Sequence, residues 1–183
     1  MLSGHRGFHC QHRGDDFPII RDLLRLVQPV TIVELGTDRG GFAAVLAECA
    51  RAWCGRVITF DIDRKFSVDL LLAFPNIEFV QADVLSAPVP YLVDVLAQES
   101  VMLYCDNGNK PREVEMYARY LRPYSLLGVH DYNSDIMAAW VEPFTRAHGF
   151  VPFGHERFET LRNAWYPEPM TRLWVRTTDA VAA

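Results

Sequence analysis

The sequence predicts an α/β fold: a doubly wound, mostly parallel sheet of seven strands with an antiparallel strand at its C-terminal end. Three observations lead to this prediction. Short apolar, β-branched runs alternate with segments of helical period, as in successive β-α-β units. The stretch IVELGTDRGG (32–41) combines a strand, a tight turn and a helix start. Each of the first five expected strands has an acidic residue at or next to its end.

The five parallel strands are expected at apolar runs that suit burial on both faces of a sheet. They are 30–35, RVITFD (56–61), IEFVQAD (77–83), VMLYCD (101–106) and SLLGVHD (125–131). Helices are expected after them, at 40–53, 64–74, 90–98, 110–121 and 133–149. Right-handed crossovers then place these helices on both faces of the sheet.

Local signals indicate where several elements begin and end. Pro111 stands in the first turn of its helix, where a missing N–H costs little. Asn133 or Ser134 is expected to cap the helix over 133–149, which Pro143 would kink and Gly149 would end. Two last strands, near 150–157 and 170–177, are expected to pair antiparallel.

Length and composition limit the class of protein. The 183 residues suffice for one domain with a full core, so 1–183 is expected to be one domain. A net charge of −5 argues against a nucleic-acid partner, because phosphate binding needs a basic face. No apolar run reaches the ~20 residues of a membrane helix, and no signal peptide is recognisable. The four cysteines form no C-x-x-C pair, which is typical of reduced thiols in a cytoplasmic protein.

The glycine turn after the first strand is expected to hold a nucleotide-like cofactor. Gly40 and Gly41 are followed by Phe42 and Ala43, without the lysine and hydroxyl of a P-loop. Asp38 stands where a dinucleotide-binding turn needs its second glycine, and its carboxylate would repel a diphosphate. The turn therefore favours a cofactor without phosphate groups, and an NAD or FAD enzyme is the disfavoured alternative.

S-adenosylmethionine (SAM) is such a cofactor, since it carries a sulfonium, an amino-acid head and a ribose with free hydroxyls. Asp61 closes the second strand, where a carboxylate can accept hydrogen bonds from both ribose hydroxyls. Asp83 closes the third strand and can accept from the adenine amino group, with Val84 against the ring. A glycine turn followed by two acids in this order indicates a SAM site.

On these motifs the sequence resembles the class I SAM-dependent methyltransferases, over roughly 28–177. VELGTDRGG, TFDIDRK and VQADV are similar to the first, second and third motifs of that family. The resemblance implies a Rossmann-like fold and places Glu34 beside the methionine part of the cofactor. The cofactor-binding residues that it implies are Glu34, Gly36, Thr37, Gly40, Asp61, Ile62, Asp83 and Val84.

A second group of polar residues follows the fourth and fifth strands, which flank the expected position of the donor methyl. Asp106 ends one strand, and His130 and Asp131 end the other. Converging carboxylates could bind a hard divalent cation, which would orient a substrate hydroxyl and lower its pKa. His130 is a candidate third ligand or general base.

This stretch resembles the macrocin O-methyltransferase and cephalosporin-hydroxylase-like branch of the family, where an acid and an acid pair hold a divalent metal. The resemblance gives Asp106, His130 and Asp131 metal-binding and catalytic positions, with Asn107 as a further candidate contact. His130 departs from the usual acid; as a softer ligand it favours Mn²⁺ or another transition metal over Mg²⁺, or a site without metal. Alternatively, these residues have structural roles only. Asp106 would then cap a turn, Asp131 would start the next helix, and His130 would be a buried histidine with one hydrogen bond.

The sequence thus predicts a cytoplasmic, SAM-dependent O-methyltransferase that acts on a small hydroxylated acceptor with Mg²⁺ or Mn²⁺ assistance. The alternatives are a metal-independent transferase with His130 as base and a non-catalytic nucleotide-binding module. Residues 1–16, with His9, His12 and Arg13, are either a mobile segment or a lid over the site. A homo-oligomer is left open, because a second subunit could complete the acceptor pocket of a short chain.

Overall fold

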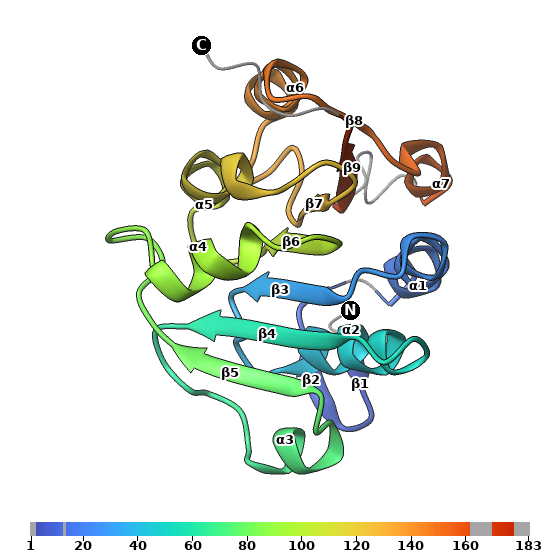
Figure 1. Cartoon of the computed structure of the whole chain (residues 1–183). Helices are drawn as coiled ribbons and strands as arrows, with labels where there is room; N and C mark the ends of the chain where they lie inside the picture. The colour runs from blue at the N-terminus through green and yellow to red at the C-terminus, as the bar shows by residue number, and fades with distance from the viewer. Residues whose placement is uncertain (1–2, 13, 162–169, 178–183) are drawn as a thin grey trace.

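Seven strands form one sheet in the computed structural model, which describes residues 3–12, 14–161 and 170–177 (Figure 1). Their order across the sheet is β5-β4-β3-β6-β7-β9-β8. β3 to β7 run parallel, and β9 pairs antiparallel with β7 and β8, so the predicted fold class is confirmed. The strands are β3 (Thr31–Leu35), β4 (Arg56–Asp61), β5 (Ile77–Gln81), β6 (Val101–Cys105), β7 (Leu126–Val129), β8 (Phe150–Pro152) and β9 (Arg172–Arg176). A separate N-terminal hairpin is formed by β1 (Ser3–His5) and β2 (Phe8–Cys10).

Helices cover both faces of the sheet, as expected. One apolar core includes α1 (Asp16–Val27), α2 (Gly41–Arg51), α3 (Asp69–Ala73) and α7 (His155–Glu159). The other core includes α4 (Pro90–Leu96), α5 (Lys110–Tyr117) and α6 (Ala138–Ala147), and a short 3-10 helix, η1 (Ala118–Tyr120), continues α5. Figure 1 shows α4 and α5 on the opposite side of the sheet from α1 and α2.

The central strands are continuous apolar runs because both faces of the sheet are covered. Ile32 of β3 and Tyr104 of β6 lie in the core beneath α1 and α2. Val33 and Leu103, their neighbours in the chain, lie in the core beneath α4 and α5. Successive side chains of a strand point to opposite faces, so an uninterrupted apolar run fills both cores.

Three predicted elements differ most from the structure in their bounds. The helix expected over 64–74 forms only as α3, and the helix expected over 133–149 begins at Ala138 as α6. The strand expected over 150–157 ends at Pro152, and α7 follows it. Gly149 ends α6 in a left-handed conformation with φ 74°, as predicted.

The segment before α6 is a tight turn in place of the predicted helix start. Asp131 and Asn133 have φ angles of 53° and 61°, and Tyr132 forms a bridge with Ile136. Asn133 Oδ1 does accept a hydrogen bond from the first amide of α6, at 2.8 Å, but the N-cap residue is Met137. The predicted cap was wrong because left-handed backbone at two positions interrupts a right-handed helix.

The N-terminal hairpin packs against α2, an arrangement that the sequence did not predict. Gly41 makes the close approach feasible, because a Cβ there would lie 2.1 Å from the carbonyl oxygen of His9. Arg6 in the hairpin turn forms an ion pair with Glu48 of α2. Three-residue strands are too short to show an alternating pattern, which is why sequence analysis missed them.

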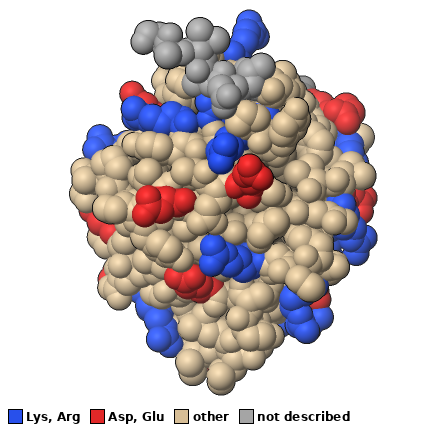
Figure 2. Space-filling view, viewed as in Figure 1, with Lys and Arg blue, Asp and Glu red and all other residues tan. Residues whose placement is uncertain are grey.

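Charged side chains of both signs lie interspersed on the face shown in Figure 2. In the part of the chain that the structure describes, no helix is long and apolar enough to cross a membrane.

Candidate active site

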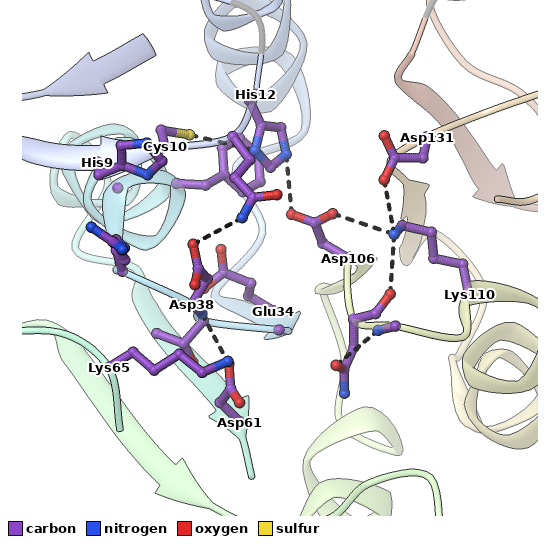
Figure 3. A pocket seen from close by; sticks show the side chains of 18 of the residues that line it. His9, Cys10, His12, Glu34, Asp38, Asp61, Lys65, Asp106, Lys110 and Asp131 are labelled. Carbon is purple, nitrogen blue, oxygen red and sulfur yellow. Dashed lines mark hydrogen bonds and ion pairs between the residues drawn. The ribbon is translucent and has the colours of Figure 1, made fainter. Parts of the chain in front are cut away.

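A pocket opens at the carboxyl ends of β3, β4, β6 and β7, where the strand order reverses (Figure 3). Its volume of about 360 Å³ lies within the range of small-molecule sites. The turn after β3 and the end of β4 form one side; the ends of β6 and β7 form the other. Residues 9–12, after the hairpin, complete the lining. The predicted site residues in this lining are Glu34, Gly36, Thr37, Asp61, Ile62, Asp106 and Asp131.

Gly36 is the point where the two sides of the pocket touch. Its φ angle is 97°, and its N–H donates to the carbonyl oxygen of Phe60 at 2.8 Å. A Cβ at this position would lie 2.6 Å from the carbonyl oxygen of Asp106, well inside van der Waals contact. Both the backbone conformation and the close approach require glycine here.

Asp61 is a buried carboxylate fixed at the pocket wall. It is 5% exposed, and its Oδ2 accepts a hydrogen bond from the backbone N–H of Asp38 at 2.9 Å. Its Oδ1 accepts from the N–H of Asp63 at 3.3 Å. Asp38 itself lines the pocket and receives a hydrogen bond from Gln11 at 3.2 Å. Two neighbouring carboxylates on this wall disfavour a diphosphate, as the sequence indicated.

Glu34 places an unpartnered acceptor in the pocket lining. The side chain is fully buried, and its Oε2 accepts from the Thr59 hydroxyl at 2.5 Å. The Thr37 and Thr59 hydroxyls are 2.6 Å apart, so Thr37 belongs to the same chain of hydrogen bonds. Oε1 has no hydrogen-bond partner among the described residues. Burial raises the pKa of Glu34 well above its ordinary value.

Glu34→Gln is expected to weaken the pH dependence of stability. Because the pKa of Glu34 is raised in the folded state, its contribution is complete below the ordinary value of 4.5 and is lost as the pH rises through the folded value. The variant cannot lose this proton, so it should lose less stability on alkalinisation than the wild type. Urea unfolding across a pH series measures this, with exposed Glu115→Gln as control. Parallel profiles for the wild type and Glu34→Gln would contradict the assignment.

Asp106, His130 and Asp131 meet at the carboxyl ends of β6 and β7, as the sequence predicted. His130 Nδ1 lies 3.0 Å from Asp106 Oδ1 and 3.2 Å from Asp131 Oδ1. Burial lowers the pKa of His130, but its hydrogen bonds to the two carboxylates outweigh burial and raise the pKa to about 9. Burial opposes ionisation of Asp131 as well, yet His130 and Lys110 hold its pKa at about 2. The imidazole therefore holds its proton near neutral pH and Asp131 is ionised.

Lys110 is the cation that sequence analysis missed. It begins α5, is 3% exposed, and its Nζ lies 2.9 Å from Asp131 Oδ2, 3.2 Å from Asp135 Oδ2 and 3.8 Å from Asp106 Oδ1 (Figure 3). It also donates to the carbonyl oxygen of Asn107 at 3.0 Å. A lysine in the first turn of a helix is ordinarily solvated, so no local pattern indicated this role. Its ammonium neutralises the acids that were expected to face a metal ion.

His12 brings the N-terminal segment into the site. It is 1% exposed, and its Nε2 lies 3.5 Å from Asp106 Oδ2 and 3.1 Å from the Tyr104 hydroxyl. Its ring stacks on Phe42, with centroids 3.7 Å apart. Residues 9–12 therefore line the pocket, whereas Arg13 lies outside the described residues. Motion of this segment as a lid stays a prediction.

Four predicted residues stand apart from the lining. His130 is buried beside Asp106, and Gly40, with φ 78°, closes the turn after β3. Asp83 is exposed, and its Oδ1 accepts from two backbone amides of the following turn at 2.9 and 3.2 Å. Val84 is 1% exposed, in the core beneath α4 and α5. The adenine contacts predicted for Asp83 and Val84 stay predictions.

Comparison with known proteins supports the fold. No protein-family model matches the sequence, and no curated protein matches it at a significant level. A structure of CmcI with Mg and SAM is 16% identical, with a TM-score of 0.68, over 93% of this chain and 76% of that chain. The O-methyltransferase TomG from Streptomyces achromogenes, involved in Tomaymycin synthesis and solved in complex with SAM, is 17% identical with a TM-score of 0.55, over 91% and 81% of the chains. A methyltransferase from Geobacter sulfurreducens is 18% identical with a TM-score of 0.62, over 91% and 80%. This chain has the Rossmann-like fold of these methyltransferases.

Proposed function

We propose that this protein is a SAM-dependent methyltransferase that transfers the methyl group to an oxygen of a small hydroxylated acceptor. The observation that carries the proposal is the shared pocket: the Gly36 turn and Asp61 face the same cavity as Asp106 and Asp131. A methyl donor on one side and an acceptor on the other can meet there in line. Positioning of the two reactants is the main contribution that an enzyme makes to such a transfer.

The cofactor side of the pocket supports SAM over a dinucleotide. The Asp61 carboxylate can accept from ribose hydroxyls, and the unpartnered Oε1 of Glu34 can accept from the amino group of the methionine part. Asp38 beside them disfavours phosphate groups. The structures of CmcI and TomG that contain SAM have the same fold as this chain.

Divalent-metal assistance is part of the proposal, with Asp106 and His130 as ligands. An ion held there would orient an acceptor hydroxyl and lower its pKa. Asp131 fits a ligand role less well than the sequence suggested, because its Oδ2 lies 2.9 Å from the Lys110 ammonium. The structure of CmcI with Mg and SAM supports a metal in this fold.

A metal-independent transferase with His130 as base is the second candidate. A general base must be neutral when the acceptor arrives, yet Asp106 and Asp131 outweigh burial and raise the pKa of His130 to about 9. An imidazole that keeps its proton at neutral pH acts as an acid or as a fixed positive charge. In the metal-assisted version the ion must replace this proton, because an imidazole binds a metal only in its neutral form.

The net charge and the size of the pocket indicate the class of acceptor. A net charge of −5 and a cavity of about 360 Å³ suit a small-molecule acceptor better than nucleic acid. We further propose that the protein acts in the cytoplasm, in keeping with four cysteines that form no C-x-x-C pair. A homo-oligomer that completes the acceptor side of the pocket stays part of the proposal.

Calorimetric titration with SAM tests the cofactor assignment directly. Asp61→Ala is expected to raise the dissociation constant roughly 10- to 100-fold, because hydrogen bonds to a charged group contribute about 1.5–3 kcal/mol. Asp63→Ala is the matched control, since Asp63 is exposed and lies outside the pocket lining. Binding of NAD in place of SAM, or SAM binding that ignores Asp61→Ala, would contradict the proposal. Transfer of a labelled methyl to hydroxylated compounds separates an enzyme from a non-catalytic SAM-binding module.

A further inference from the structure

The carboxylate of Asp106 is shared between two histidines that lie far apart in the sequence. His130, after β7, approaches Asp106 Oδ1 with its Nδ1 at 3.0 Å. His12, after the N-terminal hairpin, approaches Asp106 Oδ2 with its Nε2 at 3.5 Å. One ligand atom from each of these three residues can be chosen so that all three lie within 4.8 Å of one another. Such a convergence of nitrogen and carboxylate donors is the arrangement that a metal ion requires.

Contacts on its face and at its far nitrogen orient the ring of His12. The ring of His12 stacks on Phe42 at an interplanar angle of 11°, and its Nδ1 lies 3.4 Å from Cys10 Sγ. This second contact turns Nε2 toward Asp106; a partner on the far ring nitrogen commonly orients a metal-bound histidine. The ring centroids of His12 and His130 are only 4.0 Å apart.

One atom of this group is left without a partner in a buried position. His130 is 3% exposed, and its Nε2 has no hydrogen-bond partner in the described part of the chain. A buried imidazole nitrogen without a partner costs free energy unless a ligand or ion satisfies it. This observation is independent of the distances to Asp106, and it indicates that the His130 ring still has a position for a ligand.

The surrounding charges separate Asp131 from this group. Lys110 Nζ lies 2.9 Å from Asp131 Oδ2 and 3.2 Å from Asp135 Oδ2, so these acids have a cation of their own. Asp106 is 3.8 Å from the same ammonium and stays available to the histidines. The donor set that remains has two imidazoles and one carboxylate. Imidazole suits Zn²⁺, Fe²⁺ and Cu²⁺, whereas Mg²⁺ prefers oxygen ligands and water.

We propose that His12, Asp106 and His130 form a transition-metal site in which the N-terminal segment supplies the third protein ligand. The site binds ions such as Zn²⁺ or Co²⁺ in preference to Mg²⁺. This inference deepens the metal component of the proposed function and rests on it for its catalytic meaning. Binding of the metal alone does not depend on the cofactor, so the two can be tested separately.

Titration of the metal-stripped full chain with Co²⁺, in the absence of SAM, tests the site through the visible absorption of the bound ion. The wild type is expected to bind one equivalent, and Zn²⁺ should displace it while Mg²⁺ should not. His12→Ala is expected to weaken Co²⁺ binding roughly 100-fold. Loss of a ligand should reduce metal affinity more than loss of a residue that only supports a ligand. His9→Ala is the matched control, because His9 belongs to the same segment and the same pocket lining but not to the ligand group.

Two further measurements keep the result interpretable. His12→Cys retains a ligand that binds Co²⁺ and Zn²⁺, so it should restore binding with a changed absorption spectrum even if His12→Ala unfolds the segment. Equal Co²⁺ affinity in the wild type and His12→Ala, or Mg²⁺ binding as tight as Co²⁺ binding, would overturn the inference. SAM binding without any Co²⁺ binding would overturn the metal site and leave the methyltransferase proposal intact. Co²⁺ binding without SAM binding would support the metal site and contradict the methyltransferase proposal.

Discussion

Asp106→Asn is expected to abolish most of the methyl transfer while SAM still binds. The carboxylate contacts both histidines, at 3.0 and 3.5 Å, and lies 3.8 Å from the Lys110 ammonium. The amide of asparagine has the same size but lacks the negative charge that attracts the two histidines and the Lys110 ammonium. Groups that handle the proton or polarise the acceptor contribute about 10²- to 10⁴-fold, so kcat should fall by about 1,000-fold. Steady-state kinetics with a labelled methyl donor and calorimetric titration with SAM measure the two effects.

The matched control for Asp106 is Asp94→Asn, which removes a carboxylate from the surface of α4. Asp94 is exposed and lies outside the pocket lining, so kcat should stay near the wild-type value. Thermal unfolding of both variants shows whether the fold is retained. A kcat for Asp106→Asn within tenfold of the wild type would contradict the assignment of Asp106 to the acceptor side.

Gly36→Ala is expected to lower the free energy of unfolding by about 3 kcal/mol, because it combines two penalties. A side chain at φ 97° is strained, and its Cβ would lie 2.6 Å from the backbone oxygen of Asp106. For a chain of this size, that loss should reduce Tm by about 6 to 12 °C. SAM affinity should fall as well, because the turn after β3 and the end of β6 must move apart. Calorimetric unfolding and SAM titration measure both effects.

Gly108→Ala is the control for Gly36→Ala. Gly108 lies in the same pocket lining, but a Cβ there would have no neighbouring atom within 4 Å. This variant should unfold within about 1 kcal/mol of the wild type. Equal losses in the two variants would show that the close approach between Gly36 and Asp106 does not matter.

The sheet could be predicted because its determinants are local. The apolar run of β3 is bounded by Gly36, and the runs of β4 and β6 end at acids, so period, turn chemistry and polarity agree in the sequence. The elements with wrong bounds are those whose ends depend on the rest of the fold. Asn133 has the chemistry of a helix cap, yet its left-handed backbone belongs to the turn that carries Asp131.

The convergence of Asp106, His130 and Asp131 could also be predicted. Neighbouring parallel strands present their carboxyl ends at one edge, so residues that follow β6 and β7 must lie close together. The protonation of these three residues could not be predicted. It depends on Lys110, which lies at the start of α5 and neutralises Asp131. The pKa of a buried histidine is set by every charge around it, and the sequence does not give those distances.

By itself, the sequence determined the doubly wound sheet, the glycine turn, and the acids that line its carboxyl edge. Each of these follows from residues that are neighbours in the chain or from the regular geometry of parallel strands. Only the tertiary structure decided the role of the N-terminal hairpin, which packs closely onto α2 at Gly41, and of His12, which stacks on Phe42 and reaches Asp106. Contacts between segments this far apart are fixed by shape and burial in three dimensions, and neither leaves a periodic pattern in a short segment.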